Sequence, residues 1–143
     1  MTVSSKKPRK QRRWRFTASL HERQRLVHAH LSKEARAKLK TNMRSIAVRE
    51  GDKVKIMRGK FKGHSGKVSA VDLTSLKVFI EGAVARKARG QEKLVPIEPS
   101  NIMIIEPDMS DELRMKLIAR NPAKEAKEAK AAPAAKAEAT ARV

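Results

Sequence analysis

The 143-residue sequence contains no cysteine and no tyrosine, and its aromatic residues are one tryptophan and three phenylalanines. The absence of cysteine excludes disulfides, thiolate metal ligands and thiol nucleophiles. With so few aromatic residues, a core must be small and aliphatic, and such a core is only marginally stable by itself. We therefore expect a domain that a partner helps to stabilise.

Long apolar runs are also missing. No window approaches the roughly 18 to 20 apolar residues of a membrane span. The stretch from Met1 to Arg15 has no apolar run, which argues against a secretory signal. The sequence therefore predicts an intracellular, soluble protein with no membrane partner.

Catalytic and metal-binding patterns are absent as well. The histidines stand at positions 21, 28, 30 and 64, with no acidic ligand beside His28 and His30, whereas zinc needs a set of about four ligands. The glycine-rich stretch 59–66 lacks the Gly-Lys-Ser/Thr ending of a nucleotide P-loop and leads into a strand. We predict no enzyme, no metal site, no cofactor and no small-molecule substrate.

Positive charge is what the sequence has in excess. There are 34 lysines and arginines against 15 acids, a net charge of +19, and the pI is about 10.9. Self-repulsion at this charge opposes compaction, and a polyanion relieves it. Basic domains of this size typically bind nucleic acid through phosphates. An anionic membrane surface is the main competitor, but the basic stretches lack an apolar face.

The chain divides into five expected segments. They are a basic RNA-binding arm (1–18), a helical N-terminal extension (19–45), a β domain (46–106), a C-terminal helix (107–122) and a flexible tail rich in Ala, Lys and Glu (123–143). The arm contains no acid, and Pro8 and the missing apolar stripe argue against an independently stable helix. Trp14 either stacks on bases or anchors the arm to its own domain. The candidate RNA-binding residues of the arm are Arg9, Lys10, Arg12, Arg13, Trp14 and Arg15.

Helices are expected on both sides of the β domain. Ser19 and Glu22 have the capping-box pattern, which predicts a helix over 19–31. Ser32 is a second N-cap, for a helix that runs to about Lys40. A further helix is predicted over 108–121, with Asp108 or Ser110 as N-cap. The residues expected on the apolar faces are Leu20, Val27 and Leu31 in the first helix and Leu113, Leu117 and Ile118 in the last.

The β domain opens with a turn at Gly51-Asp52 and a short strand. Val54 and Ile56 face one way in this strand, and Lys53 and Lys55 face the other. The predicted strands that follow are 68–72 with 76–81, a hairpin of 84–88 with 93–97, and a last strand over 102–105. Short strands joined by tight turns predict a small barrel of about five strands.

Two basic clusters in this domain are candidates for RNA binding. The first lies in the glycine loop, where glycine lets a phosphate approach the main-chain amides while Lys and Arg neutralise it. Tight turns that require a positive φ are the alternative reason for some of these glycines. The second cluster lies near the tip of the later hairpin, which can also be a merely solvated end. The basic residues are Arg58, Lys60, Lys62 and Lys67 in the loop and Arg86, Lys87 and Arg89 in the hairpin.

The stretch from Gly51 to Val68 resembles a KOW motif. That motif opens SH3-like barrels in ribosomal proteins and in transcription elongation factors. Flanking stretches resemble the archaeal and eukaryotic form of large-subunit ribosomal protein 24 (number 26 in eukaryotic naming), and the resemblance spans roughly residues 6 to 121. The stretches that carry it are RRWRFTA at 12–18, HAHLSKE at 28–34, VPIEPSNI at 95–102 and SDELR at 110–114.

This resemblance implies a mainly β fold with an SH3-like barrel and a structural role in the large ribosomal subunit of the cytoplasm. It also implies binding to large-subunit rRNA near its 5′ region, early action in assembly, a position near the polypeptide exit tunnel, and neighbouring ribosomal proteins as partners. The turn Arg89-Gly90-Gln91 departs from the expected Asp-Gly turn. The alternative is a KOW-domain transcription elongation or antitermination factor, disfavoured because no globular domain precedes Gly51. The loop residues that the motif match makes RNA-facing are Arg58, Lys60, Lys62, Gly63, His64 and Lys67.

Overall fold

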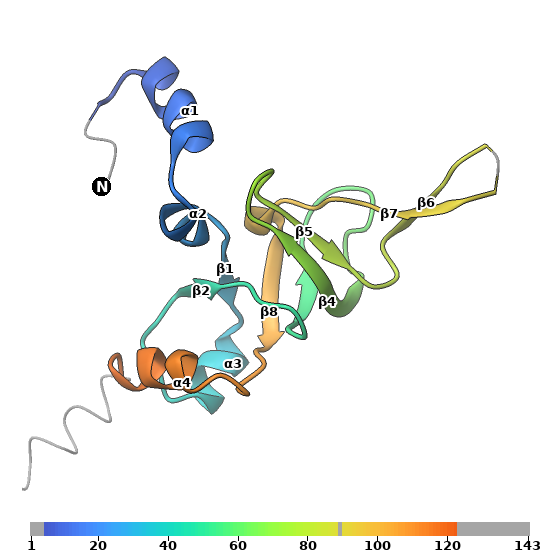
Figure 1. Cartoon of the computed structure of the whole chain (residues 1–143). Helices are drawn as coiled ribbons and strands as arrows, with labels where there is room; N and C mark the ends of the chain where they lie inside the picture. Colours follow the sequence, from blue (N-terminus) through green and yellow to red (C-terminus); the bar gives the residue numbers. More distant parts are fainter. Residues whose placement is uncertain (1–4, 89, 123–143) are drawn as a thin grey trace, which may run out of the picture.

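A six-stranded sheet organises the protein. The computed structural model describes residues 5–88 and 90–122, and it orders the sheet β2-β1-β8-β3-β4-β5, with β6 and β7 as a separate two-stranded ribbon (Figure 1). The strands are β1 (His28–Leu31), β2 (Ser45–Ala47), β3 (Lys53–Ile56), β4 (Ser65–Asp72), β5 (Lys77–Ile80), β6 (Val84–Arg86), β7 (Glu92–Leu94) and β8 (Ile102–Glu106). The helices are α1 (Pro8–Thr17), α2 (Leu20–Leu26), α3 (Lys33–Lys38) and α4 (Glu112–Ala119), with a 3-10 turn η1 (Pro99–Asn101) before β8.

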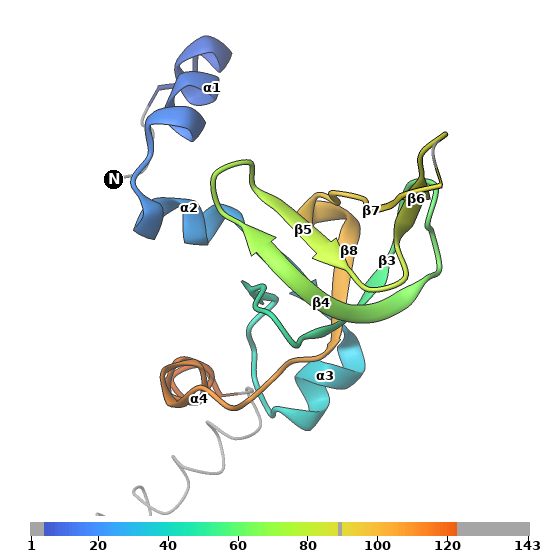
Figure 2. The same ribbon diagram turned by 45° about the vertical axis from the view of Figure 1, so that its right-hand side comes forward.

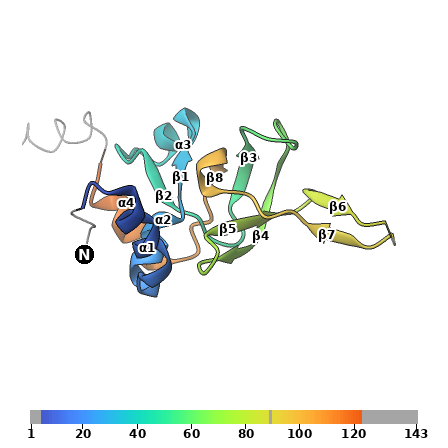
Figure 3. The ribbon, with the colours of Figure 1, turned by 90° about the horizontal axis from the view of Figure 1, so that it is seen from above.

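Two elements project away from this sheet. The β6–β7 ribbon extends from the end of the molecule opposite α4 (Figures 2 and 3). Helix α1 stands away from the sheet and buries none of its residues. The compact part is therefore the sheet with α2, α3 and α4, and the two outlying elements both carry basic residues.

The arm forms a helix, contrary to the expectation from Pro8. Proline is the first residue of α1, where its missing N–H is not needed and its fixed φ suits the helix. The Lys, Arg and Gln residues that follow are good helix formers. Proline therefore starts this helix rather than preventing it.

The predicted helix over 19–31 is too long. Helix α2 ends at Leu26, and residues 28–31 form β1, which pairs in parallel with β8 and antiparallel with β2. Ala29 and Leu31 are buried, whereas His28 and His30 are exposed. This alternation is the period of a strand, and it shows why the helical stripe was the wrong interpretation.

The predicted helix starts have different outcomes. Ser32 caps α3 as expected, because its Oγ accepts the backbone N–H of Ala35 at 2.9 Å. Ser19 occupies the N-cap of α2, but its hydroxyl donates to the Glu22 carboxylate at 3.2 Å and accepts no backbone N–H. Leu20 is 63% exposed and contributes nothing to the core.

The strand predicted after Gly51-Asp52 is confirmed. Val54 and Ile56 in β3 are buried, and Lys53 and Lys55 are exposed. Strand β3 pairs with β4 on one side and with β8 on the other. Strand β3, which begins directly after Gly51-Asp52, therefore lies at the centre of the sheet.

A closed barrel is not confirmed. Among the described residues, the paired strands end at β2 on one edge and at β5 on the other. A single bridge joins β5 to the segment before β8: Val78 and Ile97 exchange two backbone hydrogen bonds of 2.9 Å. The sheet is curled toward closure at this point without a continuous ladder.

The later hairpin is present but shorter than predicted. Its register pairs Val84 with Leu94 and Arg86 with Glu92. Pro96 follows β7, where a residue without an N–H ends the ladder. The tip residue Arg89 and the tail 123–143 lie outside the described residues.

The core is aliphatic, as the composition predicted. Its largest fully buried apolar side chains are contributed by β3, β5, β8 and the residue after α2, and none is aromatic. Phe61 is half-buried and packs at the margin. The largest members are Ile56, Ile80, Ile102, Ile104, Val27, Val54 and Val78.

Helix α4 buries only part of the predicted face: Ile118 is buried as predicted, but Leu113 and Leu117 are exposed. Asp111, not Asp108 or Ser110, is the N-cap, and it accepts the N–H of Leu113 at 2.9 Å. Leu113 is 70% exposed, whereas Arg114 and Ile118 are buried. The buried arginine explains the rotation of the helix, because its guanidinium meets the fully buried carboxylate of Asp52.

Candidate nucleic-acid interface

The glycine loop between β3 and β4 presents open backbone. The N–H of Gly63 donates to the carbonyl of Ile56, and the N–H of Ile56 donates to the carbonyl of His64, both at 2.8 Å. Gly59 and Gly63 have φ values of +92° and +91°, and a Cβ at either position meets no atom within 4 Å. The positive φ confirms that both glycines allow the turn, and the space around them is open; approach of a phosphate to this loop stays a prediction.

Three cations stand on this open loop. Arg58, Lys60 and Lys62 are exposed, and within the described part of the chain none of them forms an ion pair. Phe61 lies between them and packs against the core, which holds the loop on the sheet. The loop thus holds three cations that no acid of the described residues neutralises, and Phe61 fixes its position on the sheet.

His64 is turned toward the protein. Its Nε2 lies 2.9 Å from the carbonyl oxygen of Glu81. Gly82 follows with φ +79°, and a Cβ there stands 2.7 Å from the His64 ring. The ring therefore joins the loop to the end of β5, a structural contact that the sequence analysis did not foresee.

Lys67 is separate from the loop cations. It lies on β4 opposite Lys53 of β3, and both side chains line a cleft that also contains Glu106. Lys53 forms an ion pair of 3.4 Å with Glu106. The cations predicted to bind RNA from the loop therefore fall into two groups. Arg58, Lys60 and Lys62 are unpaired among the described residues, whereas Lys67 lies in a cleft that also contains Glu106.

The β6–β7 ribbon provides fewer free cations than its sequence indicated. The Nε of Arg86 pairs with the Glu92 carboxylate at 2.9 Å, and this pair is largely solvated. Lys87 is exposed. Among the described residues of this cluster, Lys87 alone is a cation without an acid partner.

Helix α1 carries a dense array of positive charge. Five cations of the candidate set are exposed on it, and Trp14 is half-buried. At 3.6 residues per turn, Arg9, Arg12 and Arg13 share one face. The exposed cations are Arg9, Lys10, Arg12, Arg13 and Arg15.

The end of the arm acts electrostatically on the sheet. The pKa of Glu98 is lowered first by its hydrogen bond from Lys77 and then by the charge of Lys77, with a further contribution from Arg15. The Lys77 Nζ lies 2.9 Å from the Glu98 carboxylate. The charge of Arg15 at the end of α1 thus adds to the larger effect of Lys77 on Glu98.

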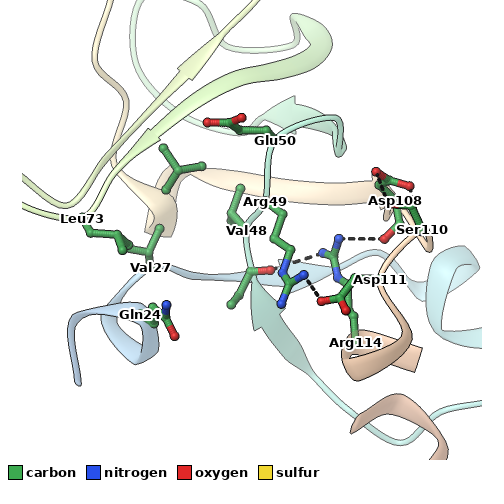
Figure 4. Close-up of a pocket in the computed structure, with 12 residues that line it drawn as sticks. Gln24, Val27, Val48, Arg49, Glu50, Leu73, Asp108, Ser110, Asp111 and Arg114 are labelled. Carbon is green, nitrogen blue, oxygen red and sulfur yellow. Dashed lines mark hydrogen bonds and ion pairs between the residues drawn. The ribbon is translucent and has the colours of Figure 1, made fainter. Parts of the chain in front are cut away.

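A second cleft is lined by acids, in contrast to the basic loop and helix α1. It lies between α2, the β2–β3 connection and the start of α4, encloses about 480 Å³, and is lined by the acids Glu50, Asp108 and Asp111 (Figure 4). Arg49 and Arg114 also line it, but Arg49 pairs with Asp111 and Arg114 pairs with Asp52. With its cations already neutralised, this cleft repels phosphate.

Two other kinds of site are absent from residues 5–88 and 90–122. This part of the chain has no group of three or more His, Cys, Asp or Glu residues placed to hold a metal ion. It also has no helix long and apolar enough to cross a membrane.

Sequence reasoning missed the buried pair of Asp52 and Arg114 and an apolar groove beside the glycine loop. In the sequence, Asp52 is marked only as a turn residue. Arg114 lies between two leucines that have the spacing of a buried face, so no local pattern marked it. The groove collects residues from 56–61, 85 and 95–101, and only the folded chain brings these together.

A small curled sheet with an aliphatic core, an acid-free basic helix and an open cationic loop define a basic protein suited to a polyanionic partner. A family model that describes ribosomal protein L26 of eukaryotes and its archaeal counterpart, number 24 in archaeal naming, matches residues 5–121. This match spans most of the 143 residues, and the chain therefore belongs to that family. It is accordingly a protein of the large ribosomal subunit that acts in translation. Proteins of this family are structural components, and the assignment does not favour a transcription factor.

Proposed function

We propose that this chain is a structural scaffold that binds large-subunit rRNA through the glycine loop and helix α1. The observation that carries the proposal is the distribution of unpaired charge. The cations of the loop and of α1 have no carboxylate at ion-pair distance within the described residues, whereas those around the acidic cleft are paired. Phosphate contacts neutralise such cations and release counterions.

The proposal extends to the architecture that presents these cations. Strands β3, β4 and β5 with the segment 95–106 correspond to an SH3-like barrel, and the Val78–Ile97 bridge supports this correspondence. Residues 1–18 act as a separate basic arm, whose helix screens the repulsion between RNA segments. Family membership supports a place in cytoplasmic ribosomes, near the exit of the polypeptide tunnel, with neighbouring ribosomal proteins as partners.

We further propose that the protein binds early in assembly near the 5′ region of the rRNA. A transcript of the 5′ third of large-subunit rRNA should then bind more tightly than a transcript of the 3′ third. Equal affinity for both at physiological salt contradicts this specificity but leaves general RNA binding intact.

Neutralising the loop tests the proposed RNA interface. The variant with Arg58, Lys60 and Lys62 changed to Gln should bind the 5′ transcript more weakly. It should also reduce the slope of log K against log salt by about 2 to 3, because each lost phosphate contact contributes roughly 0.7 to 0.9. Filter binding over a salt series measures both quantities.

A charge-matched variant provides the control. Lys33, Lys40 and Lys116 are exposed on or beside α3 and α4, away from the loop. Changing these three to Gln removes the same charge and should alter the salt slope much less. An unchanged slope in the loop variant removes the loop from the RNA interface.

A further inference from the structure

An apolar groove adjoins the cationic loop. It encloses about 390 Å³ between the residues after β3, strand β6 and the segment before β8. Phe61, Ala85, Val95, Pro96 and Ile97 provide its apolar lining. The volume is within the range of roughly 300 to 1,000 Å³ that is typical of sites for small ligands.

The rim of the groove is formed by polar and charged side chains. Arg58 and Lys60 line one side and have no ion-pair partner among the described residues. Asn101 also lines the groove, and its side-chain amide makes no hydrogen bond within the part of the chain that the structure describes. The groove therefore combines an apolar floor, two free cations and one unused amide that can both donate and accept.

Glu98 also lines the groove, but its negative charge does not neutralise Arg58 and Lys60. The Glu98 carboxylate is held by Lys77 at 2.9 Å, and it also feels the charge of Arg15 at the end of α1. The groove consequently has its free positive charge on the loop side, at Arg58 and Lys60.

We infer that this groove binds one unpaired nucleotide of the RNA, with its base against Phe61 and Pro96 and its phosphate at Arg58 and Lys60. Sequence-specific recognition of RNA typically uses splayed bases that stack on aromatic side chains and form hydrogen bonds through their edges. Asn101 is the group placed to meet the edge of the base. The inference rests on the proposed rRNA binding and adds the kind of nucleotide that is bound.

Filling the groove tests this inference without changing charge or core. Ala85 is exposed on β6 and lines the groove, whereas Ala88 is exposed on the same hairpin and does not line it. Ala85→Phe should weaken binding to the 5′ rRNA transcript about tenfold, since stacking of one base is worth roughly five- to hundredfold. Ala88→Phe should bind like the wild type.

Ultraviolet crosslinking with mass spectrometry locates the nucleotide in the same complexes. The wild-type protein should carry a nucleotide adduct on the peptide of Phe61 or on the 95–101 segment, and Ala85→Phe should lose it. Asn101→Ala, which removes the free amide and leaves the groove open, should weaken binding by about threefold to tenfold. Circular dichroism melting verifies that the variants are folded.

The outcomes separate this inference from the function on which it rests. If the wild type fails to bind the transcript, the proposed function and this inference both fall. If the wild type binds but Ala85→Phe equals Ala88→Phe and keeps the adduct, only the nucleotide site is refuted. If Ala85→Phe keeps its RNA affinity but loses binding to a neighbouring ribosomal protein, the groove is a protein site and the inference is wrong.

Discussion

Breaking the buried ion pair between Asp52 and Arg114 should strongly destabilise the protein. The Asp52 side chain is fully buried, and its carboxylate accepts Arg114 Nη1 at 2.6 Å and Nη2 at 2.8 Å. It also accepts the backbone N–H groups of Arg49 at 2.9 Å and Asp108 at 2.8 Å. The same guanidinium donates to the carbonyls of Ala47 and Asp108. One pair thus connects α4, the end of β2 and the turn before β3.

The magnitude follows from what remains after Arg114→Met. The Asp52 carboxylate keeps two backbone donors but loses its compensating charge, and breaking a buried pair in this way costs about 3 to 5 kcal/mol. For a domain of this size 1 kcal/mol lowers Tm by roughly 3 to 5 °C, so Tm should fall by about 10 to 20 °C. Urea unfolding followed by far-UV circular dichroism is the assay, because the single tryptophan lies on α1, outside the compact part that holds the pair.

Two further variants make this test specific. Lys116 lies on α4 in an exposed pair with Glu112, so Lys116→Met should cost less than about 0.5 kcal/mol. The double variant Asp52→Asn with Arg114→Met removes both charges, and its loss should be at least about 2 kcal/mol smaller than the sum of the single losses. An Arg114→Met loss close to that of Lys116→Met, or strict additivity in the double variant, refutes the reasoning.

Two other predictions concern a glycine and a histidine. Gly66→Ala should lower the free energy of unfolding by about 2 kcal/mol or more, because the new Cβ would stand 2.6 Å from the Glu81 carbonyl oxygen. Gly59→Ala faces open space and should lower it by about 1 kcal/mol, because the φ there is positive. Urea unfolding that gives the reverse order contradicts this prediction. Although His28 lies on the exposed face of β1, its pKa is lowered from its usual value of 6.5, first because neighbouring groups remove part of the water around the ring and then by the charge of Arg25. The unfolded chain then takes up the proton first, so the free energy of unfolding should fall as the pH drops below 6.5 toward the folded pKa. His28→Asn should flatten this dependence in pH-resolved urea titrations, and an unchanged slope contradicts the assignment.

Local sequence patterns predicted correctly the elements that depend only on neighbouring residues in the chain. The alternation around Val54 and Ile56 predicted β3 correctly, and Ser32 predicted the start of α3. Residues 28–31 also alternate, but the capping pattern at Ser19 favoured a longer helix. Strand β1 is fixed by parallel pairing with β8, which lies far along the chain, and no window of local sequence contains that pairing.

The face of α4 shows a second limit. Leucine spacing at 113 and 117 predicted the buried side of the helix, yet both residues are exposed. Arg114 is buried instead because Asp52 accepts its guanidinium with both carboxylate oxygens. A charged residue enters a core only with such a partner, and the partner stands 62 positions away.

The candidate interface was predictable where it depends on residue type and not where it depends on neighbours. Glycines and cations at 58–63 indicated an exposed basic loop, and the loop has that geometry. The contact of His64 with the end of β5 and the separate position of Lys67 depend on strand pairing. The groove that Phe61 lines also needs β6 and the 95–101 segment beside it.

The placement of the acids explains how a chain of net charge +19 can fold and still attract RNA. Several acids of the described residues pair with cations on the compact part, as Glu106 does with Lys53, Glu98 with Lys77 and Asp52 with Arg114. The loop and α1 contain no acid, so their repulsion is left for a polyanion to relieve. Binding of RNA should therefore stabilise the loop and the arm without disturbing the pairs that hold the sheet and α4 together. Because the cations of the acidic cleft are also neutralised, the unpaired cations of the open loop are the ones that we propose as phosphate contacts.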